Sequence, residues 1–143
     1  PYIKFEGRID YLTKGKINNH LNKNEKILID GCHSETSAKN LANYLKTNKC
    51  KKYGIWGMSK NKNPESFIKN FKGIFEKVIA IPIENESNSI PNNKLLLAAK
   101  KNNIKSEKAE TFYSALKKIS SNEKKIICIF GSLYLCGVIL NKN

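Results

Sequence analysis

Residues 26–45 read KILIDGCHSETSAKNLANYL, and this stretch decides the fold. Residues 26–29 (KILI) are rich in β-forming side chains and end at Asp30-Gly31, which predicts a short buried strand followed by a tight turn. From Ser34 onward the apolar residues recur at helical spacing; they are Ala38, Leu41, Ala42 and Leu45. The stretch therefore predicts a strand, a tight loop and a helix in succession.

Strand patterns recur through the rest of the chain. Three further apolar runs predict strands, namely residues 53–56 (YGIW), 78–81 (VIAI) and 126–130 (IICIF). Residues 104–105 predict a brief strand, and another strand is expected directly after Gly7-Arg8. Segments with helical spacing separate these runs.

Those helical segments have recognisable starts. The first begins at the cap Asn63 with proline at the first helical position, and it carries a stripe of Phe67, Ile68, Phe71, Ile74 and Phe75. Residues 95–99 form the middle of a second helix, and residues 109–119, with Phe112, Leu116 and Ile119, form a third. Gly131-Ser132 opens an apolar terminal helix that runs through Leu140.

Alternation of fully apolar strands with helices is typical of a parallel sheet covered on both faces. We therefore predict an α/β fold, a three-layer sandwich with a Rossmann-like, mostly parallel sheet. With 143 residues and 40% hydrophobic composition, the chain 1–143 is expected to be a single domain. It begins with Pro1 rather than Met and shows no export leader, which we interpret as a piece of a longer protein whose upstream part is a partner.

Composition excludes several classes of protein. The longest apolar stretches, 126–130 and 133–140, fall short of the roughly 20 residues that a membrane span needs. The four cysteines have no C-x-x-C spacing, which disfavours zinc, and Cys128 and Cys136 lie in apolar runs that predict buried free thiols. We expect a reduced, cytoplasmic protein with no metal site of its own.

The formal net charge of +14 suggests a polyanion partner at first sight. However, Arg8 is the sole arginine among 26 basic residues, and nucleic-acid recognition usually exploits the planar guanidinium. Lysines scattered among Asn and Ile are more simply the solvated faces of a protein from an AT-rich genome. We therefore expect no nucleic-acid partner.

Ligands of open parallel sheets bind beyond the carboxyl ends of the strands. Three such ends stand out, at residues 30–34, 57–62 and 131–132. None contains the G-x-G-x-x-G or the G-x-x-x-x-G-K-[ST] pattern, so the chain has no complete phosphate loop. Taken singly, Asp30 is explained as a loop cap, His33 as a solvated imidazole and Ser132 as a helix N-cap.

The ordered set of motifs resembles a known family. It comprises Gly7-Arg8, residues 26–45, GIWGMSKNK (54–62), VIAIPIENESNSIP (78–91) and IFGSLYLCGVIL (129–140). In order and spacing these are similar to the carboxyl-terminal domain of bifunctional folylpolyglutamate synthase/dihydrofolate synthase, of the Mur ligase family. The resemblance covers nearly the whole chain, and its most specific parts are the D-G-x-H segment and the terminal G-S-L-Y-L-x-G.

The resemblance implies an ATP-dependent acid–amino-acid ligase. The family's enzyme uses ATP and Mg²⁺ to phosphorylate a carboxylate of folate or dihydropteroate, and the amine of L-glutamate attacks the acyl phosphate to form an amide. The phosphate loop and most magnesium ligands lie in a larger amino-terminal ATPase domain, which is absent here and is the expected partner. The resemblance therefore implies that this piece is inactive alone, and it leaves open which of the two synthase activities the parent has.

The resemblance implies a role for each residue that matches a motif of the family. The resemblance implies ATP binding by Arg8 and Asp30, a catalytic position for His33 by the reacting phosphate or amino acid, and glutamate binding by Ser132, Ser34 and Lys62. The sequence departs from the family at four positions: Ser34 replaces Asn, Glu35 replaces Pro, and Asn61 and Asn63 replace acids.

The residues alone leave two other classes open. One is a non-catalytic α/β interaction module, in which the residues at the strand ends are merely solvated. The other, less favoured, is a basic nucleic-acid-binding domain.

Overall fold

The computed structural model describes residues 7–143, so Pro1 lies outside the described residues. These residues form one six-stranded sheet in the order β1-β2-β6-β3-β4-β5. The strands are β1 (Asp10–Leu12), β2 (Glu25–Asp30), β3 (Lys51–Trp56), β4 (Lys77–Ala80), β5 (Ser106–Lys108) and β6 (Lys125–Phe130). The edge strand β1 runs antiparallel to β2, and the other neighbours are parallel. The predicted mostly parallel sheet is confirmed.

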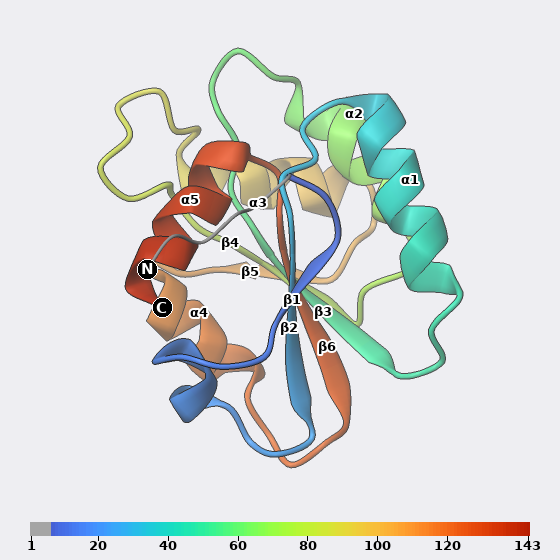
Figure 1. Cartoon of the computed structure of the whole chain (residues 1–143). Coiled ribbons are helices and arrows are strands. Elements are labelled where there is room, and N and C mark those ends of the chain that lie inside the picture. Colours follow the sequence, from blue (N-terminus) through green and yellow to red (C-terminus); the bar gives the residue numbers. More distant parts are fainter. Residues whose placement is uncertain (1–6) are drawn as a thin grey trace.

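Helices cover both faces of the sheet (Figure 1). They are α1 (Glu35–Lys46), α2 (Pro64–Ile68), α3 (Asn92–Lys101), α4 (Phe112–Ile119) and α5 (Leu133–Lys142), with short 3₁₀ turns η1 (Ile17–His20) and η2 (Lys69–Phe71). One buried cluster joins the sheet to α1, α2 and α3, and a second joins it to η1, α4 and α5. The structure is thus the three-layer sandwich that the sequence predicts.

Strand β6 shows why the sheet lies between two cores. It pairs with β2 on one side and β3 on the other. Ile126, Cys128 and Phe130 face the α1–α3 cluster, whereas Ile127 and Ile129 face the α4–α5 cluster. Every residue of the strand is buried, which explains its continuous apolar run.

The fifth strand and the fourth helix do not have the predicted boundaries. The fifth strand lies at 106–108 rather than 104–105, because the Ile104 amide donates to the Ala99 carbonyl (3.0 Å) and closes the turn after α3. The helix predicted over 109–119 begins at Phe112, because Thr111 and Ser114 form a capping box there.

The helix after Asn63 is shorter than its apolar stripe predicts. Asn63 caps it and Pro64 opens it, as expected, but the α-helix ends at Ile68 and a 3₁₀ turn follows to Phe71. Gly73, at φ +79°, then turns the chain. Ile74 and Phe75 are buried beyond the helix, so apolar spacing located the core correctly and the helix incorrectly.

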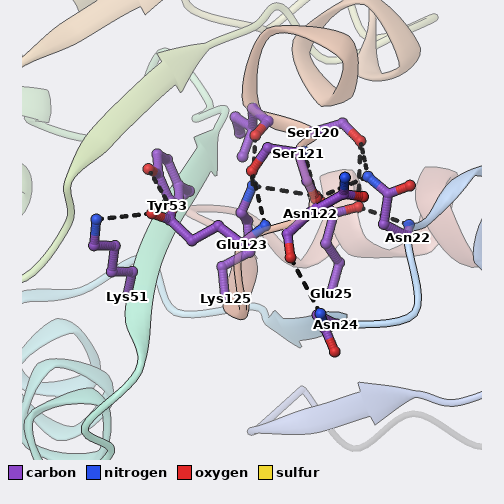
Figure 2. Close-up of polar contacts among 11 residues, drawn as sticks. Asn22, Asn24, Glu25, Lys51, Tyr53, Ser120, Ser121, Asn122, Glu123 and Lys125 are labelled. Carbon is purple, nitrogen blue, oxygen red and sulfur yellow. Dashed lines mark hydrogen bonds and ion pairs between the residues drawn. The ribbon is translucent and has the colours of Figure 1, made fainter.

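A buried polar network lies at the amino ends of the strands (Figure 2). The Lys125 ammonium donates to the Ile119 carbonyl (2.7 Å) and the Ser121 hydroxyl (2.6 Å), and it pairs with Glu25 Oε2 (3.2 Å). Glu25 also accepts from the amides of Asn22 (2.9 Å) and Ser121 (3.0 Å). With two hydrogen bonds and an ion pair to the buried Lys125 ammonium, this network stabilises the loops at that end.

Candidate functional site

Two adjacent cavities lie at the carboxyl end of the sheet. Cavity 1, of about 250 Å³, is lined by residues 7–9, residues 30–34, the start of α1 and Leu133. Cavity 2, of about 260 Å³, is lined by residues of the loops after β3, β4 and β6. Both cavities are lined by His33 and Leu133, which therefore form the wall between them.

All six predicted site residues line these cavities. Cavity 1 contains Arg8, Asp30, His33 and Ser34, and cavity 2 contains His33, Lys62 and Ser132. The structure thus brings all six to one end of the sheet; what each one binds remains a prediction.

Asp30 organises the cavity 1 side. Its carboxylate accepts from the Ile9 amide at Oδ2 (3.0 Å) and from the Cys32 amide at Oδ1 (2.8 Å), and the Gly31 amide donates to the Gly7 carbonyl (3.1 Å). The residue is 6% exposed. These bonds fasten residues 7–9 to the end of β2, which puts Arg8 at the cavity.

The protonation of His33 follows from its partner. Its Nδ1 lies 3.0 Å from the Gly31 carbonyl, and a carbonyl can only accept, so Nδ1 carries the proton. Nε2 has no hydrogen-bond partner among residues 7–143. The half-buried ring therefore presents Nε2 as an acceptor when neutral and as a donor when protonated.

Two serines cap the helices at this rim. The Ser132 hydroxyl accepts from the Leu135 amide (3.2 Å), and Ser132 is 4% exposed. The first two amides of α5, at Leu133 and Tyr134, have no partner among residues 7–143, and both residues line cavity 2. The Ser34 hydroxyl accepts from the Ser37 amide (3.2 Å) in a capping box. The interpretation of Ser132 as an N-cap is confirmed.

Glycines allow the strand ends to approach closely. A Cβ on Gly31 would lie 2.8 Å from Leu133 Cγ and closer still to its Cδ2. Gly131 has φ +111°, and a Cβ there would meet the Gly57 carbonyl and lie 2.6 Å from Trp56 Cδ1. Gly31 thus lets the end of β2 lie against Leu133, and Gly131 lets the end of β6 lie against Gly57 and Trp56.

The loop after β3 carries Lys62, whose amide donates to the Ser59 carbonyl (3.2 Å). The adjacent Asn63 caps α2, accepting from the amides of Glu65 (3.0 Å) and Ser66 (3.2 Å). Asn and Asp are about equally good N-caps, so the replacement of an acid by Asn63 keeps this role. Asn61 lines cavity 2 beside Lys62.

Glu86, which the sequence patterns did not single out, lines cavity 2 from the loop after β4. Residues 84–93 have the composition of an exposed loop, and no motif marks Glu86 within it. The one signal for it was topological, because this loop also follows the carboxyl end of a parallel strand.

The cavities show no thiol chemistry and no metal site within the described chain. Burial, with the Asp30 charge as a smaller cause, raises the pKa of the Cys32 thiol well above its ordinary value, so the thiol stays protonated. No group of three or more His, Cys, Asp or Glu side chains in residues 7–143 could hold a metal ion. Over the same residues, no helix has the length and apolar character of a membrane span.

Comparisons with known proteins point to one family. Residues 13–142 match the family model described as dihydrofolate synthetase, C-terminal domain. A comparison with curated protein sequences gave no match.

Several solved structures share the fold. Folylpolyglutamate synthase from Thermotoga maritima is 26% identical with a TM-score of 0.77, and the match covers 96% of this chain and 30% of that one. The bifunctional folylpolyglutamate synthase/dihydrofolate synthase from Yersinia pestis, complexed with AMPPNP and Mn, is 13% identical with a TM-score of 0.75, over 96% of this chain and 31% of that one. E. coli FolC in complex with DHPP and ADP is 13% identical with a TM-score of 0.71, and the match covers 85% of this chain and 29% of that one. The chain thus spans roughly a third or less of these proteins.

Proposed function

Since the chain belongs to the family of dihydrofolate synthetase C-terminal domains, we propose that it is one half of an ATP-dependent ligase, a folylpolyglutamate or dihydrofolate synthase. The ligase joins L-glutamate to the carboxylate of folate or dihydropteroate through an acyl phosphate. The other half is an amino-terminal ATPase domain that carries the phosphate loop. The present domain closes over that half and supplies part of the nucleotide site and of the glutamate site.

One observation carries this proposal: two cavities of similar size share the wall formed by His33 and Leu133. The reaction needs such an arrangement, because the phosphorylated acid and the amine must meet before water hydrolyses the acyl phosphate. Cavity 1 then serves the nucleotide, and cavity 2 serves the amino acid.

On the nucleotide side, Arg8 offsets the charge of the transferred phosphoryl group. Asp30 is an acceptor, so its partner is a ribose hydroxyl rather than a phosphate, and its two amide bonds hold the segment that carries Arg8. When bound, Mg²⁺ neutralises phosphate charge. The described residues offer no cluster for it, so we assign its ligands to the amino-terminal domain.

On the amino-acid side, the free amides of Leu133 and Tyr134 form a helix N-terminus that favours a carboxylate by roughly 0.3–1 kcal/mol. Lys62 lines the same cavity and supplies a cation for the second carboxylate of glutamate. Ser132 fixes the helix start. The Ser34 hydroxyl is engaged with Ser37, so we expect the contribution of Ser34 to be smaller than the resemblance implies.

His33 lies where the two substrates meet. In the reaction, the glutamate nitrogen attacks the acyl carbon, the C–O bond to phosphate breaks, and the nitrogen loses a proton. The Nε2 atom of His33, fixed in orientation by the Gly31 carbonyl, is positioned to hold that proton or to contact the departing phosphate.

The test compares this chain alone with the chain joined to its ATPase domain, measuring glutamate-dependent release of ADP. We expect no activity from the 143 residues alone and turnover in the joined protein. We expect Arg8→Ala to lower that turnover without unfolding the domain. Lys72→Ala, at an exposed lysine away from both cavities, is the control and is expected to leave turnover unchanged. Ligation by the chain alone would contradict the proposal that the ATPase domain is required. Unchanged kinetics in both Asp30 and His33 variants would favour the interaction module instead.

A further inference from the structure

Cavity 2 contains two opposite charges that do not pair with each other. Glu86 is the one carboxylate among the described residues that line it, and Lys62 lies in the same lining. No ion pair within residues 7–143 involves either of them, although Glu84, two residues away, pairs with Lys142 at 2.7 Å. Among the described residues, the carboxylate and the ammonium of this lining are therefore both without an ion-pair partner.

The loop that carries Glu86 is fastened to the loop that carries Lys62. Ser59 and Ser89 form an antiparallel bridge, the Lys60 amide donates to the Asn88 carbonyl (2.6 Å), and the Ile90 amide donates to the Met58 carbonyl (2.8 Å). These bonds fix the spacing of the two loops.

The Glu86 carboxylate itself is held on one side. Its Oε1 accepts from the Asn88 amide (3.0 Å), and Oε2 has no partner among residues 7–143. Asn85 takes a left-handed conformation (φ 59°), which turns the chain immediately before Glu86. The half-buried carboxylate is thus oriented by its own loop with hydrogen-bonding capacity left over.

A zwitterion complements such a lining. The free amides at the start of α5 and the Lys62 ammonium suit carboxylates, whereas Glu86 suits a cation. We propose that Glu86 binds the α-ammonium of the incoming amino acid, and that it selects an amino acid over a dicarboxylic acid without an amine. This inference rests on the proposed function and adds to it a residue that determines specificity.

The experiment uses the complete ligase and three variants. Glu86→Gln keeps an oxygen for the Asn88 amide and removes the charge. Glu84→Gln removes a charge from the same loop outside cavity 2 and is the matched control. Lys62→Met removes the cation of the same cavity. For each variant, the KM for L-glutamate, the KM for ATP and the inhibition constant of glutarate, which is glutamate without its amine, are measured.

We expect Glu86→Gln to raise the KM for L-glutamate about 10- to 100-fold, as for loss of one charge-assisted hydrogen bond, with the KM for ATP and the inhibition constant of glutarate unchanged. Glu84→Gln leaves all three at the wild-type values. Lys62→Met weakens glutamate and glutarate together, which shows that both occupy cavity 2.

Two results overturn the inference while leaving the ligase activity standing. One is a KM for glutamate that Glu86→Gln does not change. The other is an equal weakening of glutarate by Glu86→Gln, which would mean a general distortion of the cavity. If the complete ligase shows no glutamate-dependent ADP release, the proposed function fails, and this inference fails with it.

Discussion

Replacement of Gly131 by alanine tests whether the rim at the carboxyl end of the sheet depends on close backbone packing. Gly131 lies between β6 and the cap of α5, at φ +111°, a conformation that L-residues rarely adopt. Its hypothetical Cβ meets the Gly57 carbonyl and two atoms of the Trp56 ring, at 2.6 and 3.0 Å. Trp56 is fully buried and the carbonyl is backbone, so neither can move aside easily.

The expected loss of unfolding free energy in Gly131→Ala has two parts. The strained backbone conformation accounts for about 1–3 kcal/mol, and the overpacking against Gly57 and Trp56 for about another 1–3 kcal/mol. Together they give about 2–6 kcal/mol, a large share of the roughly 5–15 kcal/mol that stabilises a typical domain.

Urea unfolding of the 143-residue chain measures this cost against two matched glycines. Gly73 also has a positive φ (+79°), but a Cβ there meets nothing within 4 Å, so Gly73→Ala is expected to cost about 1–2 kcal/mol from the backbone alone. Gly137 lies inside α5 with open space around it, so Gly137→Ala is expected to stabilise by about 0.5–1 kcal/mol. A Gly131→Ala cost no larger than that of Gly73→Ala would refute the packing argument.

Three further tests each concern one buried polar or titratable side chain. Lys125→Met leaves Glu25 buried without its cation and is expected to cost about 3–5 kcal/mol in urea unfolding, part of which Glu25→Gln restores in the double variant. Asp30→Asn removes one of the two side-chain oxygens that accept from backbone amides and is expected to cost about 1–3 kcal/mol of unfolding free energy, against less than about 0.5 kcal/mol for Asp10→Asn at an exposed site. Burial raises the pKa of Cys136 from 9.0 to about 12, so the stability that the protonated thiol contributes is complete below pH 9 and falls by about 1.4 kcal/mol per pH unit between pH 9 and about 12. Cys136→Ala removes that contribution to the alkaline slope, and a slope equal to that of the unmodified chain would contradict the assignment.

The fold follows from the sequence wherever a strand is buried on both faces. Residues 126–130 are apolar throughout because β6 lies between two neighbours and two helical layers, and so short an apolar run between turn residues is typical of a central parallel strand. Boundaries were wrong where hydrogen bonds decided them. The turn at Ile104 depends on a bond to Ala99, and the shortened helix after Asn63 depends on the turn at Gly73. Apolar spacing contains no information on either.

The candidate site was predictable in position but not in detail. Strand ends and motifs located all six residues, because parallel strands place their carboxyl ends at one edge. The role of Asp30 as the anchor of residues 7–9 was not predictable, since its partner Ile9 is 21 residues away and pairs through the backbone. Glu86 was missed because polar loops resemble one another in composition, and only the fold shows which loop side chains line a cavity.

The two ends of the sheet differ in how completely their polar groups are satisfied. At the amino end, the Lys125 ammonium makes two hydrogen bonds and an ion pair within the chain (Figure 2). At the carboxyl end, the α5 amides, His33 Nε2 and the Glu86 carboxylate have capacity left over among the described residues. Such groups can bond to a ligand without first losing a bond within the chain. Polar groups without a partner among the described residues, rather than the total charge of +14, therefore point to the carboxyl end of the sheet as the end where we propose binding.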